Sequence, residues 1–191
     1  MTKQLLQEFM NREPDRRADR RTLLVAQLAD HVLAHGMAST SLRPLAAAVG
    51  TSDRMLLYYF ADKAELIGAV LAKVSVRMTA LLDAHRAPVP MSPARLEAHL
   101  MPMLTDPAVW PYLQLWLEIA SLSARGDPTC RHVGENIARG FVAWLADQLE
   151  PVDSQSGTDA AMRLLMTIEG AVLLISLGLG PDVHRAVTPP S

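Results

Sequence analysis

The side chains with potential for catalysis or metal binding show no spacing typical of an enzyme site. None of the six histidines stands at metal-ligand spacing from acidic residues or from the single Cys130. The histidines are at positions 31, 35, 85, 99, 132 and 184. There is also no glycine-rich phosphate loop, no Gly-x-Ser-x-Gly elbow and no paired-carboxylate motif. We therefore expect no enzyme activity, no catalytic residue, no metal and no cofactor.

Cys130 lies just inside a predicted helix start, where a lowered pKa could make it a redox sensor. A buried, unreactive thiol is the favoured alternative. The single cysteine excludes an intrachain disulfide framework and fits a reducing compartment. The longest apolar run, residues 171–179, is too short to cross a bilayer, and the chain opens without an export signal. Together these features predict a cytoplasmic protein with no membrane partner.

The composition predicts a globular, all-helical protein. Of the 191 residues, 50% are hydrophobic and only 5% are aromatic, while alanine and leucine are frequent, which favours helices over strands. Residues 1–77 carry 11 Lys/Arg against 8 Asp/Glu, whereas residues 78–191 carry 7 against 12. The N-terminal part is therefore the one suited to an anionic partner.

The segment from Ser41 to Leu66 predicts two short helices that meet at a glycine turn. Ser41 is expected to cap the first helix, which closes at Gly50, and Ser52 to cap the second, Asp53 to Tyr59. A longer helix with an apolar face precedes them and ends at Gly36, and another follows from Asp62, with Glu65 completing a capping box. This order is typical of a helix-turn-helix, whose second helix enters the major groove of DNA.

At these residues the sequence resembles the TetR family of regulators. The matching positions are Ser41-Leu42-Arg43-Pro44-Leu45-Ala46, Val49-Gly50-Thr51-Ser52, Leu56, Tyr58-Tyr59-Phe60, Lys63, Glu65 and Leu66. The resemblance covers about residues 20–70. It implies an all-α protein with an N-terminal three-helix DNA-binding domain, followed by a helical ligand-binding and dimerisation domain. Within this frame we expect a loose arm at 1–15, the helix-turn-helix domain at 16–70 and the second domain at 71–191.

The resemblance also implies which residues contact double-stranded DNA. Ser41, Tyr59 and Lys63 would touch phosphates, and side chains at or near base edges would be Arg43, Asp53, Arg54 and Met55, with Ser52 and Leu57 completing the surface. The physical chemistry agrees, because Arg54 can read guanine through a bidentate contact and Lys63 stands at a helix start. Leu45, Ala46, Leu56 and Phe60 would be core residues, and Tyr58 is assigned to the core as well.

Two positions depart from the family pattern. Leu57 stands where the family usually has Tyr, and Tyr59 stands where it usually has His. Leu57 is expected to pack on a thymine methyl group or on a sugar. Asp53 is repelled by phosphate unless it accepts a hydrogen bond from a cytosine amino group. The arginines at positions 16, 17, 20 and 21 are either a solvated charge run or a minor-groove arm.

The second domain is expected to supply a homodimer interface and a ligand site. By resemblance, the predicted helices 128–149 and 159–179 pair with those of a second subunit in a four-helix bundle, and the tail from Gly180 is expected to fray. A small hydrophobic effector would be enclosed by the middle helices, although such a stripe is also typical of plain core. The candidate lining is Leu100, Met103, Leu104, Trp110, Leu113, Trp116 and Leu117. Glu118 and Glu169 could select a cationic ligand, but exposure or a helix-to-helix hydrogen bond is favoured.

Three alternatives stay open at this point. The chain could be a DNA-binding protein of the same fold that senses no small molecule, with a solid second domain. It could instead be a helical enzyme, which the motifs do not support, or a helical protein-protein adaptor. The resemblance favours a repressor that a ligand releases from a palindromic operator.

Overall fold

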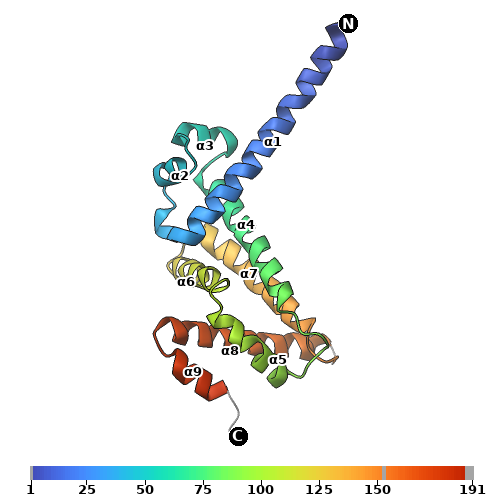
Figure 1. Ribbon diagram of the computed structural model, residues 1–191, viewed down its shortest axis with the longest axis vertical. Helices are drawn as coiled ribbons and strands as arrows, with labels where there is room; N and C mark the ends of the chain where they lie inside the picture. Colours follow the sequence, from blue (N-terminus) through green and yellow to red (C-terminus); the bar gives the residue numbers. More distant parts are fainter. Residues whose placement is uncertain (1, 152–153, 188–191) are drawn as a thin grey trace. The chain divides into compact units, whose positions relative to one another are not determined.

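The computed structural model describes residues 2–151 and 154–187, with side chains placed for 16–38, 40–151 and 157–186, and the helical expectation is confirmed (Figure 1). The described residues form α-helices and two short 3₁₀ segments, and they contain no strand beyond one isolated bridge between Met91 and Leu149. The chain divides into two compact units, Met1–Val74 and Ser75–Ser191.

Unit 1 contains α1 (Thr2–His35), a 3₁₀ turn (Met37–Ser39), α2 (Leu42–Ala48), α3 (Asp53–Tyr59) and the first part of α4 (Lys63–Ala84). The helix α2 packs against both α1 and α3 (Figure 1). The core of unit 1 consists of apolar side chains that recur at helical spacing, as the sequence predicted. The buried set is Leu24, Leu28, Ala29, Val32, Leu45, Ala46, Leu56, Phe60, Leu66, Ile67 and Val70.

The predicted helix ends in unit 1 are largely confirmed. Gly36 and Gly50 have φ angles of 71° and 65°, a left-handed conformation that glycine adopts without steric cost. The Ser52 hydroxyl accepts a hydrogen bond from the Met55 amide at 3.2 Å and so caps α3. Ser41 stands at the N-cap of α2, but its side chain makes no capping hydrogen bond there, contrary to our expectation.

The first turns of α1 cover the segment for which we expected a loose arm. The helix begins at Thr2 and runs without interruption to His35. Residues 3–12 are mostly good helix formers, such as Lys, Gln, Leu and Glu, which explains why a helix can continue through this polar stretch.

Unit 2 contains the end of α4, α5 (Pro93–Leu100), a 3₁₀ segment (Met101–Thr105), α6 (Trp110–Ala124), α7 (Pro128–Ala146), α8 (Ser154–Ser176) and α9 (Gly180–Val187). The helix α7 packs against α6 and α8, and α9 folds back onto α8. The Asp127 carboxylate accepts a hydrogen bond from the Cys130 amide at 2.8 Å and so caps α7.

Two expectations for unit 2 were wrong. The segment from Gly180 does not fray: it forms α9, and Val183 is buried in the core of the unit, which provides the apolar contact that a short helix needs. The helix α8 begins at Ser154, whereas we expected a loop up to Thr158. Residues 152 and 153 of that loop lie outside the described residues.

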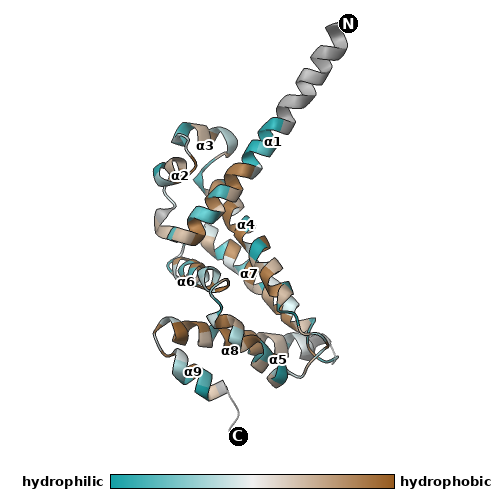
Figure 2. Ribbon diagram, in the orientation of Figure 1, coloured by the Kyte–Doolittle hydropathy of each residue, from teal (hydrophilic) through white to brown (hydrophobic). Residues whose placement is uncertain are grey.

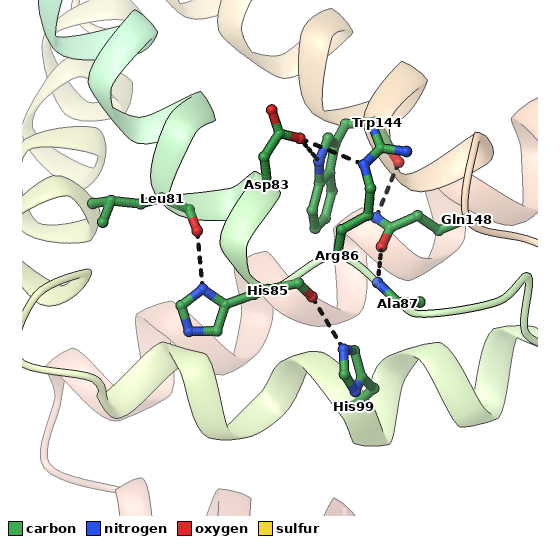
Figure 3. Close-up of polar contacts among 8 residues, drawn as sticks. All are labelled: Leu81, Asp83, His85, Arg86, Ala87, His99, Trp144 and Gln148. Atoms are coloured by element: carbon green, nitrogen blue, oxygen red, sulfur yellow. Dashed lines mark hydrogen bonds and ion pairs between the residues drawn. The ribbon is translucent and has the colours of Figure 1, made fainter.

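The C-terminal end of α4 is fastened to the C-terminal end of α7 by a group of polar contacts (Figure 3). The Trp144 indole donates to Asp83 Oδ1 at 3.1 Å, and the Gln148 side chain accepts from the Ala87 amide at 2.7 Å. Gln148 also donates to the Trp144 carbonyl at 3.1 Å. Gln148 is itself buried, and its side-chain oxygen provides the acceptor for the backbone N–H of Ala87. We call these four residues the α4–α7 clasp.

Candidate nucleic-acid interface

The helix α3 is held by one side and presents the other side to solvent. Leu56 and Phe60, four residues apart and therefore on one face, are both buried in unit 1. Asp53, Arg54 and Leu57 are exposed. This is the orientation that a recognition helix requires, because the outward side chains are free to enter a groove.

The other predicted DNA-binding residues are also accessible on unit 1. Met55 is exposed on α3 and Tyr59 is half-buried at its end. The remaining four are exposed and lie at or near the N-termini of α2, α3 and α4; they are Ser41, Arg43, Ser52 and Lys63. The residues thus gather at the helix-turn-helix, with both of its short helices contributing.

Tyr58 is not a core residue, contrary to our expectation. Its side chain is 57% exposed, because it lies on the opposite side of α3 from Leu56 and Phe60. The guanidinium of Arg17 lies 4.7 Å from the centre of the Tyr58 ring. The Tyr59 ring packs edge-on against the Tyr58 ring, with 5.1 Å between the two ring centres. The aromatic pair therefore covers the surface of α3 toward its C-terminus.

Two arginines of α1 contact the corner between α3 and α4. Arg17 donates a hydrogen bond to the Tyr58 carbonyl at 2.8 Å. Arg21 forms an ion pair with Glu65 at 2.7 Å, and its guanidinium lies 4.8 Å from the centre of the Phe60 ring. Sequence reasoning treated these arginines as a solvated run or a DNA-binding arm and missed their partners, which lie 41 and 44 residues away.

Glu65 also satisfies the backbone at this corner. The Glu65 amide donates to Asp62 Oδ1 at 2.8 Å, which confirms Asp62 as the N-cap of α4. One Glu65 carboxylate oxygen accepts from the Ala61 amide at 2.5 Å, one residue before the Asp62 amide that a capping box would use. The hydrogen bond from Ala61 and the contact with Arg21 lower the pKa of Glu65. The carboxylate is therefore held in its charged form.

The predicted effector-lining residues lie together in unit 2. Leu100, Met103, Leu104 and Leu113 belong to its buried core. Trp110 and Leu117 pack against that core and are partly buried, as is Trp116. These side chains come from α5, the following 3₁₀ segment and α6.

A carboxylate joins α8 to α6 inside unit 2. The Trp116 indole donates a hydrogen bond to Glu169 Oε2 at 2.6 Å, which is the favoured helix-to-helix alternative for this glutamate. Burial raises the pKa of Glu169, and the hydrogen bond from Trp116 opposes that shift. The sequence contained both residues but gave no signal that they meet.

Cys130 has the properties of a structural thiol. It is buried at the start of α7, and burial together with the neighbouring Asp127 carboxylate raises the pKa of the thiol to about 11. Such a group is almost entirely protonated at neutral pH and does not act as a nucleophile.

Among the described residues no group of His, Cys, Asp and Glu could hold a metal ion. No helix in the described part of the chain is long and apolar enough to span a bilayer.

Comparison with known sequences agrees with this geometry. Residues 28–70 match the sequence family described as "Bacterial regulatory proteins, tetR family", a segment that runs from α1 into α4. A search of curated protein sequences found no match.

The whole chain is similar to solved structures of regulators and binding proteins. A transcriptional regulator from Rhodococcus sp. Rha1 aligns with a TM-score of 0.66 at 21% identity, covering 87% of this chain and 90% of that one. The multidrug binding protein EbrR, complexed with imidazole, aligns with a TM-score of 0.63 at 23% identity, covering 91% and 92%. GusR of Salmonella enterica aligns with a TM-score of 0.56 at 18% identity, covering 88% and 93%. The similarity extends over both units and shows a shared fold.

Proposed function

We propose that the chain is a dimeric, sequence-specific transcriptional regulator of the TetR family, which reads operator DNA with α3; the match of residues 28–70 to that family supports the proposal. Regulators of this family bind DNA and are not enzymes, in line with the motifs of the sequence. The observation that carries the proposal is the orientation of α3, whose outward side is exposed while Leu56 and Phe60 anchor it. Its place of action would be the cytoplasm, where DNA is accessible.

The proposed contacts divide into positioning and reading. Lys63, Tyr59 and Ser41 hold phosphates and fix the register of α3 on the duplex. Arg54 reads guanine, and Leu57, which is 43% exposed, packs against a thymine methyl group. Ser52, Asp53, Met55 and Arg43 complete the surface around them.

Selection of bound sequences from random duplex DNA tests this assignment. We expect a palindrome, because a twofold dimer presents two copies of α3 to two half-sites about one helical turn apart. Replacing Arg54 with Ala should relax the choice at one base step per half-site, at a cost of about 1–3 kcal/mol per contact. Replacing Lys63 with Ala should weaken binding to all sequences about equally and reduce the salt dependence by roughly one phosphate contact per subunit. The reverse pattern would overturn the two roles.

The proposed dimer uses the exposed apolar side of α8, a helix that is hydrophobic along much of its length (Figure 2). Met162, Met166, Leu173 and Leu177 fall within an arc of about 60° at 100° per residue, and all four are exposed. Leu174 and Leu179 add exposed apolar surface beside them. A contiguous patch of this kind is typical of a protein interface, and α7, which packs on α8, would contribute to the same bundle.

A small apolar effector is the proposed signal. The support is the apolar interior of unit 2, together with the similarity in fold to EbrR, which is described as a multidrug binding protein. The effector would act through α4, which begins in unit 1 and ends in unit 2, by changing the spacing of the two α3 helices. Ligand would then weaken operator binding, and operator would weaken ligand binding by the same factor. A binder that leaves operator affinity unchanged would refute the coupling.

Two outcomes would favour other functions. Operator binding with no small-molecule response, and a solid interior of unit 2, would indicate a DNA-binding protein without an effector. Absence of DNA binding, or binding insensitive to salt, would indicate a protein-protein adaptor. Repression, rather than activation, is the expected effect of operator occupancy.

A further inference from the structure

The corner between α3 and α4 is held from one side by α1. This corner consists of Phe60, Ala61 and Asp62, the three residues that separate the recognition helix α3 from α4. The C-terminal carbonyl of Tyr58 accepts from Arg17, and the Ala61 amide donates to Glu65, which is itself paired with Arg21. Two arginines of α1 thus reach both ends of this corner.

These contacts have a physical purpose because α3 is short. A helix of seven residues cannot form its hydrogen bonds stably on its own, so its position depends on its neighbours. A cation at a helix C-terminus stabilises the last carbonyl groups and opposes the negative end of the helix dipole. Arg17 occupies that place, and its contact with the exposed Tyr58 ring holds the last turn of α3 from outside the core.

Arg21 acts on the same corner through a carboxylate. Its guanidinium lies over the ring of Phe60, which anchors the C-terminal end of α3, and it pairs with the Glu65 carboxylate, which accepts the Ala61 amide in the corner. Because this charge is matched by Glu65, Arg21 is poorly suited to a phosphate contact. An arginine that served as a DNA-binding arm would instead keep its guanidinium available.

We propose that Arg17 and Arg21 are positioning residues that fix α3 in its DNA-reading orientation before DNA arrives, and that they do not contact phosphates themselves. This inference rests on the proposed function, since it concerns how the recognition helix is presented. The mechanism is preorganisation: a helix already held in place loses less conformational freedom on binding.

The test compares Arg17→Met/Arg21→Met with Arg17→Lys/Arg21→Lys in the full-length dimer. Methionine retains an unbranched apolar stem without the charge or donors, whereas lysine keeps both the charge and a donor. Loss of these contacts should weaken operator binding about threefold per subunit, which is within the range for exposed ion pairs, and the two subunits together give about tenfold. We expect the double-Met variant to bind the selected operator about tenfold more weakly, and the double-Lys variant to stay within about threefold of the parent protein. Arg95→Met, an exposed arginine on α5, controls for loss of positive charge elsewhere.

Two readouts separate positioning from DNA contact. The slope of the logarithm of operator affinity against the logarithm of salt concentration should be unchanged in the double-Met variant, because no phosphate contact is lost. Each lost phosphate contact would make this slope shallower by about 0.9. Amide exchange in the DNA-free protein should accelerate at Ala61 and in the last turn of α3, and remain unchanged in α2. Circular dichroism confirms that the variant is folded.

Each remaining outcome decides the question. A shallower salt slope with unchanged amide exchange would overturn the proposal and identify the two arginines as a DNA-binding arm. Unchanged affinity and unchanged exchange would show that the contacts position nothing. If the parent protein binds no duplex, the proposed function fails, and faster exchange at Ala61 would still uphold the locking of the corner by α1.

Discussion

Glu65 shows how one side chain serves two structural purposes on this surface. Its carboxylate accepts from the backbone of the α3–α4 corner and also pairs with Arg21 of α1. Both interactions are stronger with the charged form, so folding lowers the pKa of Glu65 from its ordinary value of 4.5. The corner therefore depends on a single ionised group, and its stability depends on pH.

The pH dependence has a definite sign. A carboxyl group with a lowered pKa in the folded state adds stability above its ordinary value, and this contribution disappears as the pH falls through the lowered pKa. Glu65→Gln removes the ionisation, so we expect its free energy of unfolding to fall less steeply than that of the parent protein between about pH 5 and pH 3. Urea unfolding at a series of pH values measures this difference. Parallel curves for the two proteins would contradict the assignment.

At the scale of the elements, α3 and α4 are each positioned by contacts beyond their own sequence. The recognition helix depends on Leu56 and Phe60 inside unit 1 and on the arginines of α1 outside it. The end of α4 depends on the α4–α7 clasp, in which Gln148 is almost fully buried (Figure 3). In the proposed regulator, α4 would carry the ligand signal, so the clasp would be its fixed end in unit 2.

The clasp can be tested by removing its central amide. Gln148→Leu has a similar size but leaves the Ala87 amide without its acceptor, which should cost about 1–3 kcal/mol in the free energy of unfolding. Gln114→Leu, an exposed position on α6, is the matched control and should change stability by less than about 0.5 kcal/mol. Urea unfolding measures both. Equal stability of the two variants would show that Gln148 does not fasten the end of α4.

At the scale of the whole molecule, the proposed function requires two copies of the chain. One copy of α3 contacts only a few base pairs, whereas two copies held together multiply their discrimination. The exposed apolar side of α8 is the surface that would hold them. Met166 on α8 and Leu177, one residue past its end, are each 67% exposed and belong to an apolar patch of the kind that marks a protein interface.

A charge on this surface should separate the subunits. Met166→Glu would place two carboxylates in the proposed apolar bundle, so we expect a monomer by analytical ultracentrifugation and a loss of at least about 100-fold in operator affinity. Gln114→Glu introduces the same charge at an exposed position on α6 and should leave the protein dimeric. A dimer that persists in Met166→Glu would place the interface on another surface.

Features that depend on a few neighbouring residues could be predicted from the sequence alone. The ends of α1, α3 and α7 follow from Gly36, Ser52 and Asp127, whose backbone angles or capping hydrogen bonds act within one helical turn. The buried side of α3 also follows locally, because Leu56 and Phe60 are four residues apart and share a face. The exposure of Asp53, Arg54 and Leu57 could therefore be predicted from the sequence, and the same periodicity argues against our assignment of Tyr58 to the core.

Only the tertiary structure decided which side chains meet across long stretches of chain. The partners of Arg17, Arg21 and Gln148, and the pair of Trp116 with Glu169, are separated by 41 to 61 residues. Helical periodicity predicts which face of a helix is buried, but the relative rotation and offset of packed helices select the partner. The docking of α9 through Val183 has the same origin, because it depends on what lies opposite that residue rather than on the residues beside it.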